Sequence, residues 1–359
     1  MAGLGTIAVL TSGGDAPGMN AGLRALTKLA AAQGVNVLGV VLGYDGLIDG
    51  EHRPLTIDHD GELWPVPSVD RAAGAGGTVL GSARSKRFMT LEGRAKAAES
   101  IRAAGIDGLV IIGGNGSLTG AHLLATEHGI PVVGLPASID NDIGGTTTAI
   151  GVDTAVNTII DACDRISDTA TAHRRAFIVE VMGRDCGYLA MASAIAAGAD
   201  AVLYREQKRT EDEVVQAVER AIRRGFTRNK QRVLIIKSEG VRLPGTKLAR
   251  VLNQRIEGDL VRVTVLGHLV RGGRPSFQDR RIASRMAYAA LGALTAGQTD
   301  RMAAWQSSSP AATATSDPAV SLVPLDAVLE ETDALLRGES PIMKWRLETM
   351  EKISGVLGV

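Results

Sequence analysis

The chain has 359 residues, more than the about 250 to 300 that a single hydrophobic core accommodates, so we expect two domains. Its 39 basic and 39 acidic residues balance and only 3% of residues are aromatic, which argues against nucleic acid or a membrane surface as partner. Two cysteines without a Cys-x-x-Cys pair, no basic leader and no long apolar run predict a soluble, unexported, cytoplasmic protein without a disulfide framework or a zinc site.

Short apolar runs rich in β-branched residues alternate with stretches of helical period. The runs predict strands at residues 6–10, 35–41, 108–112, 131–135, 177–181, 201–204 and 232–236. The helical periods predict helices at residues 20–33, 93–104 and 211–224. This alternation is typical of an α/β fold, in which helices cover both faces of parallel sheets.

Four loops that follow predicted strands are rich in glycine and polar residues. They are residues 11–20 (T-S-G-G-D-A-P-G-M-N), 113–117 (G-G-N-G-S), 136–146 (P-A-S-I-D-N-D-I-G-G-T) and 181–187 (V-M-G-R-D-C-G). Ligands of open parallel sheets bind beyond the carboxyl ends of the strands. The four loops therefore predict one common cleft.

The first two loops have the composition of an anion site. Gly13 and Gly14 carry no Cβ, so backbone N–H groups can approach an anion, and the positive end of a helix dipole follows. In the second loop Ser117 is placed to begin a helix and to donate its hydroxyl to a phosphate. This loop has neither P-loop nor G-x-G-x-x-G spacing. Either loop alone is compatible with a plain tight turn, but together they favour phosphate binding.

The third loop places Asp140 and Asp142 two residues apart, directly after an apolar strand. Two close carboxylates repel each other unless a cation or a shared proton compensates. Phosphoryl transfer needs a carboxylate that accepts a hydroxyl proton and an oxygen ligand for Mg²⁺, so one aspartate could serve each task. An Asx-rich turn with solvated carboxylates is the alternative.

Several basic side chains stand next to glycine or small residues in the same part of the chain. Guanidinium groups bind phosphate in a bidentate manner and keep their charge. Each of them taken alone is more often a surface or salt-bridge residue, and an isolated histidine is more often a core residue. The candidates are Arg84, Arg175, Arg184, Arg262, His268 and Arg271.

Residues 306–324 are poor in large apolar side chains and predict a flexible loop. Amphipathic stretches follow at residues 325–336 and 341–353, where we expect ordered structure to resume.

Taken together, the loops resemble those of the 6-phosphofructokinases from about residue 6 to about residue 292. The motifs that carry the resemblance are L-T-S-G-G-D-A-P-G-M-N-A, G-G-T-V-L-G-S-A-R, I-D-N-D-I-x-G-T, V-E-V-M-G-R-x-C-G and T-V-L-G-H-x-x-R-G-G, in this order. The resemblance implies two α/β/α lobes with mainly parallel sheets. The larger, nucleotide-binding lobe would comprise residues 1–149 and about 264–305, and the smaller, sugar-phosphate lobe residues 150–263 and about 325–359.

The resemblance also implies roles for the residues that match the motifs. Asp140 resembles the general base that takes the proton of the sugar C1 hydroxyl, and Asp142 the acid near Mg²⁺. Arg184 and Arg84 resemble the groups that stabilise the transferring phosphoryl, with Ser138 where the family usually has threonine. The remaining sugar-phosphate positions are Met182, Gly183, Glu239, His268 and Arg271 from the same subunit, and Arg175 and Arg262 from a neighbouring subunit of a homotetramer.

On the nucleotide side, the matching positions are Gly14, Tyr44, Arg84, Asn115, Gly116, Ser117 and Gly120. Pyrophosphate-using relatives usually carry aspartate at the position of Gly116 and lysine at that of Ala137, so both residues favour ATP as the donor. Asn115 replaces an aspartate associated with Mg²⁺; it keeps an oxygen ligand and loses a charge, which predicts weaker metal binding.

The resemblance thus implies ATP-dependent phosphorylation of fructose 6-phosphate at C1, with Mg²⁺ as cofactor. Two alternatives stay open: pyrophosphate as donor, and a catalytically weak homologue that binds sugar phosphate or nucleotide. The match to the effector site of bacterial relatives is partial, because Arg24, Lys28 and Asp200 agree with it in charge, whereas His59 and Ser167 stand where arginines are common. Allosteric control is expected from the family, and the partial match argues against regulation by ADP or phosphoenolpyruvate in the manner of those relatives.

Overall fold

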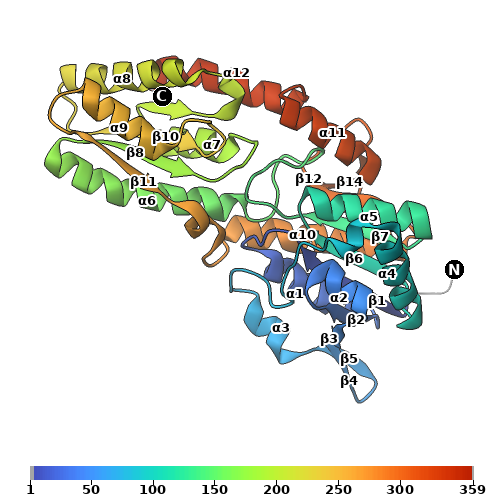
Figure 1. Ribbon diagram of the computed structural model, residues 1–359. Helices are drawn as coiled ribbons and strands as arrows, with labels where there is room; N and C mark the ends of the chain where they lie inside the picture. Colours follow the sequence, from blue (N-terminus) through green and yellow to red (C-terminus); the bar gives the residue numbers. More distant parts are fainter. Residues whose placement is uncertain (1–3, 358–359) are drawn as a thin grey trace. The chain divides into compact units, whose positions relative to one another are not determined.

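The predicted alternation of strands and helices forms two sheets, each in its own unit of the chain (Figure 1). The computed structural model describes residues 4–357. Met1–Gly3, which belong to the N-terminal stretch predicted to lack a basic leader, lie outside the described residues. The larger unit comprises the chain up to Ser138, Ile143–Asp153 and Arg271–Ala334. The smaller unit comprises Ile139–Asp142, Thr154–Val270 and the chain from Leu335 onward. The predicted fold class of two α/β lobes with mainly parallel sheets is confirmed.

The sheet of the larger unit has eight strands in the order β13-β14-β12-β7-β6-β1-β2-β3. The five strands from β12 to β2 run parallel, and antiparallel strands close both edges. A separate hairpin joins β4 (Thr56–His59) and β5 (Glu62–Pro65). The strands of the large sheet are β1 (Thr6–Ser12), β2 (Asn36–Val40), β3 (His52–Pro54), β6 (Gly108–Gly113), β7 (Val132–Pro136), β12 (Arg301–Trp305), β13 (Thr313–Ala314) and β14 (Val320–Pro324).

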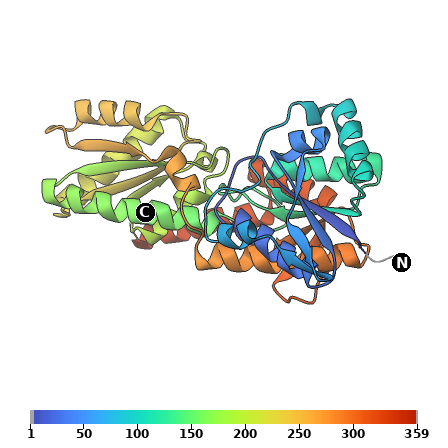
Figure 2. The ribbon, with the colours of Figure 1, turned by 90° about the horizontal axis from the view of Figure 1, so that it is seen from below.

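Helices cover both faces of this sheet. Helices α1 (Met19–Ala31) and α10 (Phe277–Thr295) pack together on one face, and α2 (Gly43–Asp49), α4 (Leu91–Ala103) and α5 (Asn115–His128) lie on the other (Figure 2). Helices α3 (Pro67–Ala72) and α11 (Leu325–Arg337) and a 3₁₀ turn at Arg87–Met89 complete the unit. The central strands are buried on both sides, as expected for a parallel sheet.

The strand register brings the predicted loops to one edge of the large sheet. Ser12 at the end of β1 pairs with Gly113 at the end of β6, and Gly113 pairs with Pro136 at the end of β7. The loops that follow these three strands therefore leave the sheet side by side.

The smaller unit contains a four-stranded, fully parallel sheet in the order β11-β8-β10-β9. Its strands are β8 (Ala176–Val181), β9 (Ala201–Leu203), β10 (Val233–Ser238) and β11 (Val261–Val265). Helices α8 (Glu211–Thr227) and α9 (Gly245–Arg255) form its hydrophobic core with the sheet, and α6 (Val152–His173) covers the opposite face (Figure 2). Helix α12 (Pro341–Leu357) packs on α7 (Tyr188–Ala196).

Two expectations for the C-terminal region need correction. The predicted flexible loop contains β14, which pairs with β12 and whose Val320, Leu322 and Val323 are buried. The short apolar stretch of β14 was not predicted as a strand because it follows a long polar stretch. Helix α11 groups with the larger unit up to Ala334, although it was assigned to the smaller lobe. The reason is that Leu325 and Val328 are fully buried there and the Thr332 hydroxyl accepts a hydrogen bond from Gly144 N at 2.8 Å.

No helix within residues 4–357 has both the length and the apolar composition that crossing a membrane requires.

A lysine inside the smaller sheet gives a stability prediction. Lys237 of β10 is fully buried, and its Nζ lies 3.0 Å from Glu180 Oε2 and 3.1 Å from Ser238 O. We expect Lys237→Met to lower the free energy of unfolding by about 3 to 5 kcal/mol, because it leaves the Glu180 carboxylate, whose side chain is only 16% exposed, without its cation. A urea titration measures this loss, and the double variant Glu180→Gln/Lys237→Met should recover part of it.

The control for this prediction is Lys247→Met. The Lys247–Glu211 pair is equally close, at 2.8 Å, but both side chains are about half exposed. Such a pair contributes about 0 to 1 kcal/mol. Equal losses for Lys237→Met and Lys247→Met would contradict the prediction.

Candidate functional site

The first glycine loop of the larger unit holds an arginine against its backbone. Gly13 has a φ of 85°, which favours glycine, and a Cβ on Gly14 would lie 2.9 Å from Arg271 Nη1. The same Nη1 donates a hydrogen bond to Asp15 O at 3.2 Å. Gly14 and Arg271, predicted as nucleotide and sugar-phosphate residues, are therefore in contact, because Arg271 of the 3₁₀ turn Gly267–Arg271 reaches the first glycine loop.

The second glycine loop forms the N-terminus of α5. Gly114 is the N-cap and supplies no side chain, and the first turn of the helix contains no acidic residue. Gly116 is exposed, and a Cβ on it would meet no atom within 4 Å. The N–H groups and the positive dipole end at Asn115 and Gly116 therefore form a place where an anion can bind.

Tyr44 packs against helix α5 and binds its backbone. Its ring is 4% exposed and stacks on Phe88 with ring centroids 3.8 Å apart, while its hydroxyl donates to Ser117 O at 2.6 Å. Burial raises the pKa of Tyr44 well above its usual value, so the hydroxyl stays a donor. A Cβ on Gly120 would lie 2.8 Å from Tyr44 Oη, which explains the glycine at that position. Tyr44, Ser117 and Gly120 thus form one packed unit, and direct contact of Tyr44 with a nucleotide stays a prediction.

The segment before Arg84 is tied to the first loop. Ser82 Oγ donates to Gly13 O at 2.6 Å, and Thr11 Oγ1 donates to Gly81 O at 2.8 Å. Arg84 follows two residues later with an exposed side chain, and no side-chain hydrogen bond or ion pair to another residue of 4–357 holds its guanidinium. Gly14, Arg84 and the N-terminus of α5 all belong to the larger unit. The sequence analysis did not single out Ser82, although this serine lies in the G-S-A-R motif quoted there.

The smaller unit brings together the predicted base and a predicted arginine. Asp140 is 3% exposed, and Arg184 Nε lies 3.8 Å from Asp140 Oδ2 with a half-exposed side chain. Arg184 is presented by a turn in which Gly183 has a φ of 137° and Arg184 one of 47°. A Cβ on Gly183 would lie 2.5 Å from Cys186 O, so only glycine fits this turn. The arrangement places a guanidinium edge next to a carboxylate that is almost fully buried.

Two further predicted sugar residues lie at the same turn. Glu239 Oε1 accepts a hydrogen bond from Arg184 N at 2.9 Å, so Glu239 fixes the turn that presents Arg184. Met182 precedes the turn and is 8% exposed. The predicted grouping of Met182, Gly183, Arg184 and Glu239 around one loop is therefore found.

Arg175 and Arg262 do not join this group. Arg175 directly precedes β8, and Arg262 of β11 pairs with Phe177 at the start of β8, whereas Arg184 follows the opposite end of β8. Six strand residues span about 20 Å. Arg262 instead binds Asp259, with Nη2 2.9 Å from Oδ2, and this guanidinium lowers the pKa of the Asp259 carboxyl. His268 is exposed on the 3₁₀ turn Gly267–Arg271.

The donor atoms predicted for a metal are oxygens. Asn115 would offer an amide oxygen and Asp142, which is half-buried, a carboxylate. Oxygen ligands of this kind fit Mg²⁺, which also keeps several waters. Within residues 4–357 there is no group of three or more His, Cys, Asp or Glu residues arranged to hold a metal alone.

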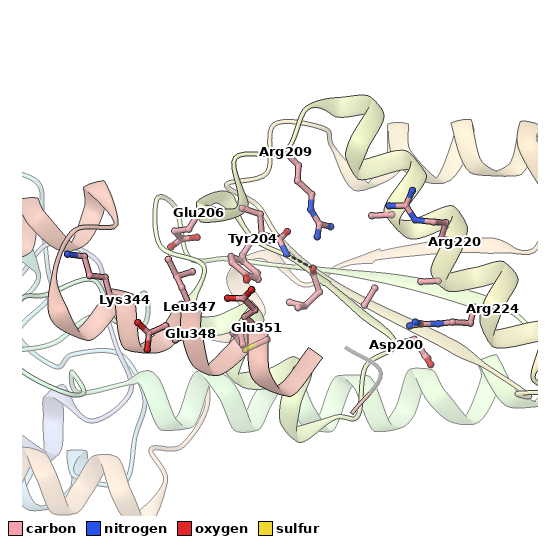
Figure 3. Close-up of a pocket in the computed structure, with 16 residues that line it drawn as sticks. Asp200, Tyr204, Glu206, Arg209, Arg220, Arg224, Lys344, Leu347, Glu348 and Glu351 are labelled. Atoms are coloured by element: carbon pink, nitrogen blue, oxygen red, sulfur yellow. Dashed lines mark hydrogen bonds between the residues drawn. The ribbon is translucent and has the colours of Figure 1, made fainter. Parts of the chain in front are cut away.

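The three positions that agree with an effector site already have partners. Arg24 and Lys28 lie 2.7 and 3.6 Å from Asp70, and Asp200 binds Lys230 and accepts from Leu234 N at 2.9 Å. Asp200 also borders a hollow of about 1070 Å³ between β9, α8 and α12 in the smaller unit (Figure 3). Arg220 and Arg224 extend into it from α8, whereas Glu348 and Glu351 line it from α12. The mixed charge of this lining does not single out an anionic effector.

Known proteins resemble this chain over most of its length. The family model described as Phosphofructokinase matches residues 6–294. An ATP-dependent 6-phosphofructokinase of Thermotoga petrophila is 48% identical over 300 residues, which are 84% of this chain and 89% of that protein. An ATP-dependent 6-phosphofructokinase 2 of Bacteroides thetaiotaomicron is 46% identical, with 82% and 87% covered.

Solved structures agree with the sequences. Pichia pastoris phosphofructokinase in the T-state has a TM-score of 0.84 and 30% identity to this chain. The likeness covers 99% of this chain and 40% of that chain, so this protein spans less than half the length of the Pichia chain. Both glycine loops, the turn at Asp140–Asp142 and Arg184 lie inside the matched residues. The chain therefore belongs to the phosphofructokinase family.

Proposed function

We propose that this chain is an ATP-dependent 6-phosphofructokinase, which phosphorylates fructose 6-phosphate at C1. The observation that supports this most is the buried Asp140 carboxylate 3.8 Å from the Arg184 guanidinium, on two loops that the family model includes. A carboxylate shielded from water beside a fixed cation suits proton abstraction next to a transferring phosphoryl group. The relatives named above carry the same activity in their names.

In the proposed reaction, the C1 hydroxyl oxygen attacks the γ-phosphorus of ATP, the bond to the β-phosphate oxygen breaks and ADP leaves. Asp140 accepts the hydroxyl proton. Arg184 and Arg84 offset the charge that spreads over the transferring group, and the N–H groups at Asn115 and Gly116 hold the donor phosphates. Met182, Gly183, Glu239, His268 and Arg271 would position the sugar phosphate, together with Ser138, whose hydroxyl replaces that of the family's usual threonine.

The proposed cofactor is Mg²⁺, held by Asn115 and Asp142 together with the phosphates. When bound, it would neutralise phosphate charge on the donor. We expect Asn115→Asp to lower the half-saturating Mg²⁺ concentration several-fold, because a hard cation prefers an anionic oxygen. Rates measured against free Mg²⁺ at saturating ATP check this, and an unchanged half-saturation would remove Asn115 from the metal site.

Parallel kinetics with two donors test the proposed function. Purified protein should phosphorylate fructose 6-phosphate with ATP and show at least about 100-fold lower kcat/KM with pyrophosphate, because Gly116 and Ala137 leave the donor site open to a nucleotide. The reverse preference would favour pyrophosphate as donor. Binding of ATP without turnover on any sugar phosphate across a wide Mg²⁺ range would favour a regulatory homologue.

We further propose that the protein acts in the cytoplasm as a homotetramer with shared active sites. The position of Arg175 and Arg262, at the end of β8 remote from Arg184, suits residues that serve a neighbouring subunit. Mixing subunits tests this: Asp140→Ser and Arg262→Ala should each be nearly inactive, and refolding them together should restore part of the activity. Two inactive parents that give an inactive mixture, or full activity of a monomer on dilution, would contradict shared sites.

A further inference from the structure

Asn141 lies between the two predicted catalytic aspartates in an unusual backbone conformation. Its φ is 50°, in the left-handed region that non-glycine residues rarely adopt, and its side chain is 1% exposed. Asparagine tolerates this region better than most residues, and the buried surroundings of Asn141 select it among the conformations open to the turn. What holds the backbone of Asn141 therefore also determines where the carboxylates of Asp140 and Asp142 point.

An arginine from the far end of the chain holds this backbone. Arg346 Nη1 donates a hydrogen bond to Asn141 O at 3.1 Å and lies 3.9 Å from Cys186 Sγ. The Arg346 guanidinium carbon also lies 4.4 Å from the ring centroid of Tyr188. Arg346 therefore connects the turn that carries Asp140 with the segment that follows Arg184.

The surroundings of Arg346 bury its charge without neutralising it. The residue is 5% exposed, and among residues 4–357 no carboxylate lies within ion-pair distance of its guanidinium. A buried cation without a paired anion is costly, and a backbone carbonyl and an aromatic face compensate it only in part. Methionine has nearly the same length and would occupy much of this space without that cost, so packing alone does not account for an arginine.

The positive charge of Arg346 reaches the same region as the charge of Asp142. Burial raises the pKa of the Cys186 thiol to about 12, the Arg346 charge opposes this rise, and the charges of Glu206 and Asp142 add to it. The charges of Arg346 and Asp142 therefore both affect the pKa of the Cys186 thiol. In a poorly solvated interior, such charges interact more strongly than in water.

Arg346 is held by a helix that is anchored on both sides of it. The hydroxyl of Ser340 accepts a hydrogen bond from Met343 N at 3.1 Å at the start of α12. Met343, Arg346 and Met350 are all buried, and their spacing places them on one face of the helix. The backbone that carries Arg346 is therefore fixed independently of the contact with Asn141.

We propose that Arg346 is a positioning residue for the phosphoryl-transfer reaction: it fixes the Asp140–Asp142 turn and the Arg184 segment relative to each other. The proposal rests on the proposed function. It concerns a residue outside the part that the family model matches, since that match ends at residue 294. The side chain acts through Asn141 O and does not itself contact substrate.

The test compares Arg346→Met and Arg346→Lys with a control on the same helix. Arg346→Met keeps the length of the side chain and removes its donors, so kcat should fall about 10- to 100-fold while KM for fructose 6-phosphate changes less than about threefold. Arg346→Lys keeps the charge but loses the planar fork and should be intermediate. The control Met350→Ala removes buried volume from the same face and should lower the melting temperature with kcat unchanged.

Chemical rescue separates positioning from stability. Free guanidinium ions at tens of millimolar should raise the kcat of Arg346→Ala several-fold and leave wild-type protein and Met350→Ala unchanged, and this experiment decides the question even if Arg346→Met does not fold. An Arg346→Met protein that is folded and keeps kcat within about threefold of wild type overturns the proposal. So does an Arg346→Ala protein that guanidinium does not rescue. Failure of the proposed function is distinct, because wild-type protein would then lack sugar-phosphate turnover.

Discussion

We expect Asp140→Ser to lower kcat by about 1000-fold. The KM for fructose 6-phosphate should change by no more than about threefold in either direction. The expectation follows from the burial of this carboxylate. Asp140 is 3% exposed, so bulk water cannot readily replace it as proton acceptor, and Arg184 Nε lies 3.8 Å from it. A general base acts on the reacting hydroxyl chiefly in the transition state, so its loss affects turnover more than substrate binding.

Two further variants make this test specific. Asp140→Asn preserves the shape of the side chain and removes only the proton acceptor, so it should lose as much kcat as Asp140→Ser. Asp185→Asn changes a carboxylate in the neighbouring loop that is 64% exposed and paired with Arg205, and it should keep nearly full turnover. The measurement is initial rate against substrate concentration at saturating ATP. Near-normal kcat in Asp140→Asn would exclude Asp140 as the base.

Much of this arrangement can be read from local sequence. Alternating apolar runs predict the strands, and parallel pairing then places the loops after β1, β6 and β7 at one edge, as the register of Ser12, Gly113 and Pro136 confirms. The grouping of Gly183, Arg184 and Glu239 is also accessible, because two adjacent parallel strands end there. In each case, parallel pairing places the ends of neighbouring strands at one edge, whereas the order of the strands in the sheets, such as β8 between β11 and β10, differs from their order along the chain.

The contacts that sequence reasoning missed connect residues far apart in the chain. Arg271 reaches Asp15 across 256 positions, and Arg346 reaches Asn141 across 205. Nothing in the local pattern around Arg346 distinguishes it from the many exposed arginines of amphipathic helices. The strand β14 was missed for another reason: its few apolar residues follow a polar stretch, and they are stabilised by pairing with β12 and by packing against α10. Local sequence propensity gives no signal for contacts and strands that depend on tertiary packing.

The second large effect is expected at Gly116. We expect Gly116→Asp to lower kcat/KM for ATP at least about 100-fold. A side chain at this position projects into open space, because no atom lies within 4 Å of its Cβ and the backbone is not left-handed. An acidic residue in the first turn of α5 even favours the helix, by up to about 1 kcal/mol. The variant should therefore fold, and a loss of activity would then reflect weaker binding of the donor phosphates.

The expected loss comes from charge, and a matched variant separates charge from size. Two like charges 4 Å apart repel by roughly 4 kcal/mol at an effective dielectric constant of 20, which solvent screening reduces, and each 1.4 kcal/mol corresponds to about tenfold in kcat/KM. Gly116→Ala adds the Cβ without the charge and should stay within about threefold of wild type. Initial rates with ATP for the three proteins measure the difference. If Gly116→Asp behaves like Gly116→Ala, the donor phosphates do not bind at the α5 N-terminus, because a carboxylate placed among these N–H groups would compete with any phosphate bound there.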